Sequence, residues 1–158
     1  MTPREHVRLT GTIEVGLPPE QAFDLFTPTG ERAWSEGWDP RFPAPVADET
    51  APGTVFTTDH GGRTTIWTVV RREAGTAITY SRTTPGDRAG LVSVALQPSA
   101  GGSTVTVGYD LTALAPESDH ALREFAHHYP AFLAEWRHAI TVLLAAAPRG
   151  GEAHDAAR

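Results

Sequence analysis

The stretch that decides the fold is ESDHALREFAHHYPAFLAEWRHAITVLLAAA, residues 117–147. Its apolar side chains recur every three or four residues, at Leu122, Phe125, Tyr129, Phe132 or Leu133, Trp136, Ile140, Leu143 and Ala147. This spacing predicts one long amphipathic helix. Pro130 lies inside it and is expected to kink it, because the proline ring removes a backbone hydrogen bond and crowds the preceding turn. The apolar face of this helix needs another apolar surface to cover it.

Upstream of the helix the period of the apolar residues changes to two. Six runs alternate apolar and polar side chains, over residues 7–15, 55–58, 64–72, 77–82, 89–97 and 104–114, a pattern typical of half-buried strands. Gly61-Gly62 separates two of these runs and predicts a two-residue hairpin turn. Residues 20–26 have the spacing of a short helix. The segment 27–53 is rich in proline and glycine and predicts short helical turns and loop around Trp34 and Trp38.

These two periods together predict the architecture. A sheet with one apolar face and a long apolar helix can bury both faces only when the helix lies across the sheet. The sequence therefore predicts an α+β fold, in which a curved antiparallel sheet of six to seven strands grips a long kinked C-terminal helix, with short helices after the first strand. A length of 158 residues fits one domain. We expect residues 1–148 to form it and residues 149–158 to be a disordered tail.

Composition excludes several functions. Cysteine is absent and all 13 basic residues are arginine, which excludes disulfides, thiolate metal sites, cysteine nucleophiles and lysine Schiff bases. With a net charge of −6 and no basic run, nucleic acid is not an expected partner. No apolar stretch approaches about 18 residues, so no membrane span is expected and we expect a cytoplasmic protein. The abundance of alanine, glycine, proline and arginine is typical of GC-rich bacterial genomes.

The sequence contains no motif that supports a metal site or a cofactor site. Two Glu-x-x-His pairs, Glu124 with His127 and Glu135 with His138, have a spacing that ligates iron in helical bundles. At about 100° per residue, however, they fall on the face opposite the apolar stripe. No glycine-rich phosphate loop, Gly-x-Ser-x-Gly elbow or His-Glu-x-x-His motif occurs. We therefore expect no metal and no cofactor.

Short segments spread over the chain carry a family resemblance. They are Thr12-Ile13-Glu14-Val15, Pro18-Pro19-Glu20-Gln21-Ala22-Phe23, Phe26-Thr27-Pro28, Gly30-Glu31-Arg32, Gly37-Trp38-Asp39-Pro40, Gly53-Thr54-Val55-Phe56, the Trp67 strand, 107–114 and the Trp136 helix. Their order over about residues 7–146 resembles the START-like helix-grip (SRPBCC) superfamily, in its bacterial polyketide cyclase/dehydrase-like branch. The resemblance implies a fold with a groove between sheet and helix. It leaves the activity open, because relatives bind, transport, cyclise, hydrolyse or serve as protein modules.

Strand parity indicates which side chains face the helix. With Gly61-Gly62 as the turn, His60 faces Arg63, and Phe56 and Trp67 share one face with Thr58 and Thr65. The same parity places Tyr80, Arg82 and Tyr109 on that face in the following strands. An unpaired buried hydroxyl costs about 1 to 3 kcal/mol, so phenols and an arginine there suggest a cavity with a polar end. The candidate ligand-binding residues are Trp38, Phe56, Thr58, His60, Trp67, Tyr80, Arg82, Tyr109, Phe125, His128, Tyr129 and Trp136.

Each polar candidate also has a structural interpretation. Tyr80 and Tyr109 fit the role of core tyrosines with their hydroxyls at the sheet rim. Arg82 directly precedes a turn at the end of the sheet, so its guanidinium is expected at a cavity mouth, where it either binds a ligand or extends into solvent. His60, beside the Gly-Gly turn, fits a solvated turn residue.

The functional hypothesis is the binding of a hydrophobic or aromatic small molecule between sheet and helix, with a polyketide cyclase or dehydratase-like reaction as an extension. No catalytic residue can be named from the sequence. The alternatives are a non-catalytic lipid or ligand carrier, and a protein-interaction or stress-response module with a filled core. The sequence leaves the oligomeric state undetermined and is compatible with a homodimer.

Overall fold

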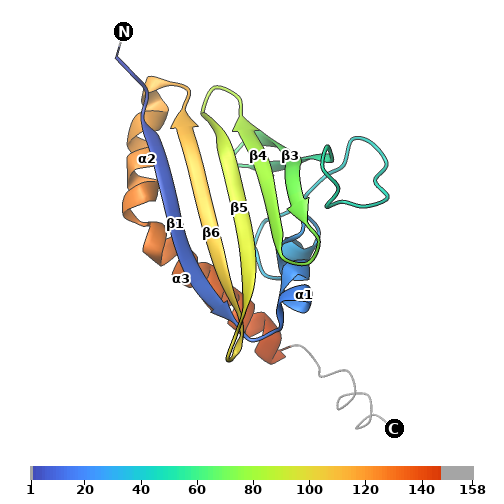
Figure 1. Cartoon of the computed structure of the whole chain (residues 1–158). Helices are drawn as coiled ribbons and strands as arrows, with labels where there is room; N and C mark the ends of the chain where they lie inside the picture. The colour runs from blue at the N-terminus through green and yellow to red at the C-terminus, as the bar shows by residue number, and fades with distance from the viewer. Residues whose placement is uncertain (1, 147–158) are drawn as a thin grey trace, which may run out of the picture.

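The computed structural model describes residues 2–146. Six strands form one antiparallel sheet in the order β1-β6-β5-β4-β3-β2. The strands are β1 (His6–Val15), β2 (Val55–His60), β3 (Arg63–Glu73), β4 (Ala77–Thr84), β5 (Arg88–Ser99) and β6 (Gly102–Ala113). The helices are α1 (Pro19–Ala22), α2 (Pro116–His127) and α3 (Tyr129–Ala146), with two 3-10 turns, η1 (Phe23–Phe26) and η2 (Gly30–Ala33). The α+β fold predicted from the sequence is confirmed (Figure 1). The tail expected over 149–158 lies outside the described residues.

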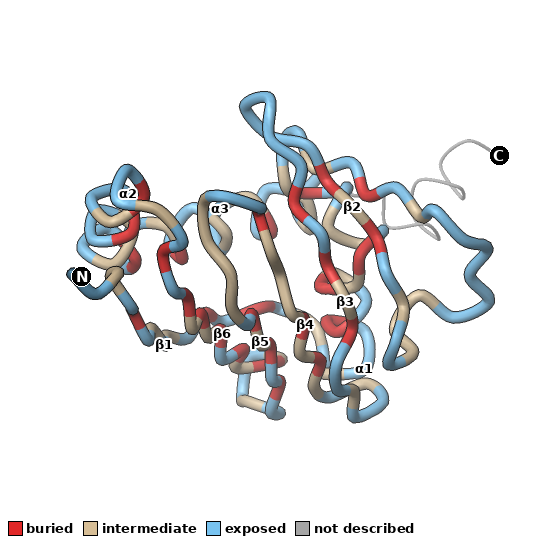
Figure 2. Tube along the Cα trace, turned by 90° about the horizontal axis from the view of Figure 1, so that it is seen from above, coloured by how far each residue is buried: buried red, intermediate tan, exposed pale blue. Residues whose placement is uncertain are grey.

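The sheet is curved, and its concave face is covered. Figure 2 shows β1, β6, β5 and β4 following one another while β3 and β2 turn up at the far end. The pairing of β3 with β4 has one irregularity, between Val69 and Arg71, and a bulge of this kind increases the local twist of a strand. Gly11 lets α3 approach β1 closely, since a Cβ there would lie 2.5 Å from Leu133 Cδ1. The core fills the space between α3 and the sheet with side chains such as Ile13, Val107 and Ile140.

The register confirms the parity argument. Gly61 and Gly62 have φ values of 58° and 79°, both left-handed, as a two-residue turn between twisted strands requires. The turn pairs His60 with Arg63 and Phe56 with Trp67. In the next pairs, Tyr80 lies beside Val69 and Val92. The predicted inward face is therefore the observed one.

The C-terminal stretch differs from the single kinked helix expected over residues 117–147. It divides at His128 (φ −96°, ψ 10°), which separates α2 from α3. Pro130 becomes the second residue of α3, a position where its missing N–H costs no helical hydrogen bond. Backbone bonds from His128 N to Glu124 O and from Phe132 N to His128 O, both 3.0 Å, bridge the break. Of the helices within residues 2–146, none has both the length and the apolar character needed to cross a membrane.

Candidate functional site

A pocket of about 390 Å³ lies at one end of the concave face. One wall is the segment Ser35–Trp38, which follows η2. The floor and the other walls are formed by side chains of β2, β3 and β4, by Asp87 in the turn after β4 and by Arg88, the first residue of β5. The pocket is thus bounded by the irregular segment on one side and by the upturned edge of the sheet on the other.

Three buried threonines form the polar floor of this pocket. Thr65 and Thr84 share a hydrogen bond of 2.6 Å between their Oγ1 atoms. The indole Nε1 of Trp67 donates to Thr58 Oγ1 at 2.9 Å. Arg82 Nη2 donates to Thr84 Oγ1 at 2.7 Å. Each hydroxyl on this apolar face is therefore paired within the floor, which fixes the orientation of Trp67 and Arg82.

Arg82 is the central charged group of the pocket. Its Cζ lies 5.4 Å from the centroid of the Trp67 ring, within the range of a cation–π contact. Its Nε is buried and has no hydrogen-bond partner among the described residues. Burial lowers the pKa of Arg82 from its ordinary value, yet a guanidinium stays protonated in proteins. The arginine therefore brings a fixed positive charge and spare donors to the pocket floor.

Trp38 forms the aromatic wall opposite the sheet. Its Nε1 donates to Pro28 O at 2.7 Å, which anchors the irregular segment. Its ring makes edge contacts with Trp67 at 5.3 Å and with Phe56 at 6.1 Å between centroids. Phe56 is itself stacked on Trp67 at 5.7 Å. Two indole rings thus face the pocket, and Phe56 supports them from the core.

The turn between β4 and β5 supplies an ion pair at the rim. Arg88 Nε donates to Asp87 Oδ2 at 2.7 Å, and Ser118 Oγ donates to Asp87 Oδ1 at 3.0 Å. Burial acts to raise the pKa of Asp87, but these two hydrogen bonds and the charges of Arg88 and Arg63 together hold the pKa below its usual value. Both oxygens of this carboxylate are therefore already engaged.

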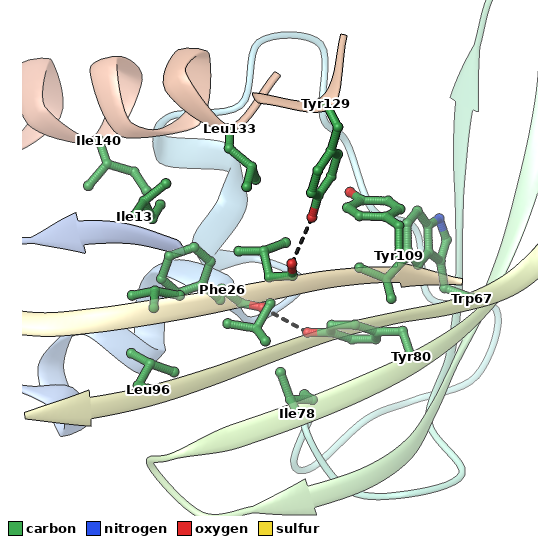
Figure 3. Close-up of a cluster of buried hydrophobic side chains, with 14 of the residues drawn as sticks. Ile13, Phe26, Trp67, Ile78, Tyr80, Leu96, Tyr109, Tyr129, Leu133 and Ile140 are labelled. Carbon is green, nitrogen blue, oxygen red and sulfur yellow. Dashed lines mark hydrogen bonds between the residues drawn. The ribbon is translucent and has the colours of Figure 1, made fainter. Parts of the chain in front are cut away.

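The space between α3 and the central strands is packed, not open. Figure 3 shows the hydroxyl of Tyr129 donating to Val107 O, at 2.7 Å, and that of Tyr80 donating to Phe26 O, at 2.8 Å. Burial raises the pKa of Tyr129 to about 12 and raises that of Tyr80 further. Backbone carbonyls thus satisfy these two phenols, so their presence on the apolar face does not require a cavity beside them.

Tyr109 and Glu31 form a second buried polar group, next to Arg82. No described residue forms a hydrogen bond with the Tyr109 hydroxyl, and burial raises its pKa. Burial likewise raises the pKa of the Glu31 carboxyl well above its ordinary value. The charge of Glu31 further raises the pKa of Tyr109, whereas the charge of Arg82 lowers it. Glu31 and Arg82 therefore each lie close enough to Tyr109 to affect its pKa, whereas Glu31 and Tyr109 are not part of the pocket lining.

The sequence-predicted site residues fall into three sets. Five line the pocket, namely Trp38, Thr58, His60, Trp67 and Arg82. Six lie in the packed interior, namely Phe56, Tyr80, Tyr109, Phe125, Tyr129 and Trp136. His128 lies outside both, because its side chain is 65% exposed and its Nε2 is 3.3 Å from Glu124 Oε2.

Two aromatic clusters organise the interior. Trp38, Trp67, Phe56 and Tyr80 form the one beneath the pocket. The other runs along α3, where Trp136 contacts Trp34 at 5.1 Å and Phe132 at 5.3 Å, and Phe132 contacts Phe125 at 5.1 Å, between ring centroids. The four tryptophans thus divide into a pocket pair and an interior pair.

Some site residues were not among the sequence candidates. Thr84 continues the inward parity of Tyr80 and Arg82, so the alternation could have identified it. Strand parity places Thr65 on the inward face with Phe56 and Trp67, but the sequence assigns it no role in binding. Glu31 lies in η2, where no period shows which side chain turns inward. Glu124, His127, Glu135 and His138 are exposed, as the helical phase predicted, and residues 2–146 contain no cluster of three or more His, Asp or Glu side chains placed to hold a metal ion.

An antiparallel sheet curved around a C-terminal helix, with a pocket at one end of the concave face, defines the START-like helix-grip class. Within that class, the chain belongs to the family described as polyketide cyclase / dehydrase and lipid transport, whose profile matches residues 6–141. This confirms the resemblance seen in the sequence. No curated protein matches the chain.

Solved structures of low sequence identity share the fold. An uncharacterized protein from Rhizobium leguminosarum is 17% identical with a TM-score of 0.63, over 87% of this chain and 96% of that one. Norcoclaurine synthase from Thalictrum flavum is 10% identical with a TM-score of 0.62, over 91% and 89%. The Aha1 dimer from Colwellia psychrerythraea is 14% identical with a TM-score of 0.58, over 85% and 96%. At these identities the likeness concerns the fold alone.

Proposed function

We propose that this protein binds an apolar or aromatic small molecule in the pocket between Ser35–Trp38 and the ends of β2, β3 and β4. The observation that carries the proposal is the combination of two indole walls with one fixed cation, at Trp38, Trp67 and Arg82. Ligand sites are mostly apolar, hold a few well-placed polar groups and enclose about 300 to 1,000 Å³. The pocket has this volume and two apolar indole walls, and polar and charged side chains make up most of the rest of its lining. Membership of a family described by cyclisation, dehydration and lipid transport supports the same conclusion.

A cyclase- or dehydratase-like reaction is the second candidate, and the group of Glu31, Tyr109 and Arg82 supports it. A carboxyl whose pKa is raised by burial holds its proton closer to neutral pH, as a general acid requires. The Tyr109 phenol also stays protonated. The direct test is incubation with a linear poly-β-keto thioester, followed by mass spectrometry for loss of one water. Glu31→Gln should lower the rate of that loss, whereas a carrier returns the thioester unchanged.

The packed interior supports a competing interpretation, a protein-interaction module with a filled core. The hydroxyls of Tyr80 and Tyr129 are satisfied by backbone carbonyls, and aromatic rings fill the space along α3. Such a module would bind no small apolar molecule at the pocket.

Fluorescence titration with phenylnaphthylamine, a neutral apolar probe, separates these candidates. We expect saturable binding with quenching of tryptophan emission, because Trp38 and Trp67 face the pocket. Ser35→Phe places a ring in the pocket from the wall segment and should abolish binding. Ser81→Phe is the matched control, because Ser81 pairs with Thr68 and Leu91 on the outer face of the sheet, and it should bind like the wild type. Absence of saturable binding, or equal binding by Ser35→Phe, would contradict the proposal.

A further inference from the structure

We infer that the pocket selects ligands that carry an anionic group, such as a carboxylate or an enolate, over neutral ligands of the same shape, and that Arg82 binds that group. This inference rests on the proposed function, because it specifies the chemistry of the ligand at the same site. Its basis is a partly buried guanidinium that is held in place and yet lacks a counterion.

The first step is that Arg82 is preorganised. Its hydrogen bond to Thr84 is backed by the bond between Thr84 and Thr65, and its guanidinium plane has the Trp67 ring beside it. Trp67 is in turn fixed by Thr58. A guanidinium held in this way loses little conformational freedom when it binds an acceptor, which favours affinity.

The second step is that Arg82 has no direct ion-pair partner within the described part of the chain, although the nearby Asp87 carboxylate favours its charged form. No acidic side chain of residues 2–146 forms an ion pair with it, and its Nε has no partner. Only Nη2 donates a hydrogen bond, although a guanidinium has five N–H donors. A buried charge is costly unless it is paired. Because the buried Nε is shielded from solvent, an anion in the pocket would pair with the remaining Nη donors.

The other charged groups around the pocket leave this position open. The Asp87 carboxylate is engaged by Arg88 and Ser118. Asp59 lies in the pocket lining, at an exposed position, and its Oδ1 accepts a hydrogen bond from Thr64, its cross-strand neighbour. Glu36, His60 and Arg63 are exposed at the rim, where water screens their charges. Among the described residues, the charge at the pocket floor without an ion-pair partner is therefore the positive charge of Arg82.

The test compares two probes that share their aromatic rings. Anilinonaphthalenesulfonate carries a sulfonate, and phenylnaphthylamine is its neutral counterpart. A charge-assisted hydrogen bond corresponds to roughly a ten- to hundredfold change in affinity. We expect Arg82→Met to raise the Kd of the sulfonate probe by that factor and to change the Kd of the neutral probe less than about threefold. Arg82→Lys should lose part of the affinity, because it keeps the charge but not the planar fork. Arg137→Met, which removes an exposed charge on α3 outside the pocket lining, is the matched control and should leave both Kd values nearly unchanged.

Each outcome separates this inference from the proposed function. Equal losses for both probes in Arg82→Met, or no loss for either, would overturn the inference and leave Arg82 as a structural or solvated residue. Failure of the neutral probe to bind the wild type would instead contradict the proposed function. If Arg82→Met unfolds, Arg82→Gln is measured in its place, since an amide can keep the bond to Thr84 without the charge. Loss of sulfonate binding in Arg137→Met as large as in Arg82→Met would also overturn the inference.

Discussion

Removing the hydroxyl oxygen from each of the three buried tyrosines tests which of these hydroxyls stabilises the fold through a hydrogen bond. Tyr80, Tyr109 and Tyr129 are all buried, but only Tyr80 and Tyr129 donate to a carbonyl, at 2.8 and 2.7 Å. Replacing either with phenylalanine removes one hydrogen bond and leaves a buried carbonyl with one acceptor bond fewer. We expect each to lower the free energy of unfolding by about 1 to 2 kcal/mol. For a chain of this size that corresponds to a fall in Tm of about 2 to 8 °C.

Tyr109→Phe is the internal control of this series. It deletes the same atom from the same layer, but the Tyr109 hydroxyl has no hydrogen-bond partner among the described residues. We therefore expect the free energy of unfolding to stay within about 0.5 kcal/mol of the wild type or to rise, because the change removes the desolvation cost of an unpaired hydroxyl and no hydrogen bond. Urea titrations followed by tryptophan fluorescence, with equal m-values for all variants, measure the differences. A loss in Tyr109→Phe as large as in the other two would refute the assignment of roles.

Three further results are expected from the same geometry. Glu31→Gln should become more stable relative to the wild type as pH rises above about 4.3. The raised pKa of Glu31 makes the folded state hold a proton that the unfolded state releases, so the stability of the wild type falls as pH rises. Parallel pH profiles of unfolding for the two proteins would contradict this. Gly30→Ala should cost about 2 to 3 kcal/mol in urea titrations, since its Cβ would lie 1.7 Å from Asp24 O, and a neutral result would show that η2 moves freely. Ile140→Ala should lower the free energy of unfolding by about 2 to 5 kcal/mol. The control Val142→Ala, at a half-exposed position of the same helix, should change it by less than about 0.5 kcal/mol. Comparable losses would mean that α3 presents another face to the sheet.

Periodicity was sufficient to predict the fold. Alternation over the strands and the three-to-four spacing after Pro116 depend on local geometry, which a sequence records directly. The Gly61-Gly62 turn also fixed the register, because a one-residue shift would move every inward side chain to the outer face. The break at His128 was not predicted. Whether a proline kinks a helix or begins a new one depends on the packing on both sides of it.

The candidate site was only partly predictable, for two physical reasons. Parity placed Thr58, Trp67 and Arg82 on the inward face, and all three line the pocket there. Parity cannot say where an inward phenol finds its hydrogen bond, however. Tyr80 donates to a carbonyl 54 positions away in the chain, a contact that no local pattern records. Glu31 was missed because an aperiodic segment gives no inward or outward signal.

The division of the four tryptophans gives the most direct test of the proposed pocket. Trp38 and Trp67 face it, whereas Trp34 and Trp136 contact each other in the interior. Two-dimensional ¹H–¹⁵N NMR resolves the four indole N–H signals during a titration with phenylnaphthylamine. Binding in the pocket predicts that the Trp38 and Trp67 signals shift and saturate while those of Trp34 and Trp136 remain in place. Larger shifts for Trp34 and Trp136, or no shift in any of the four, would contradict the account.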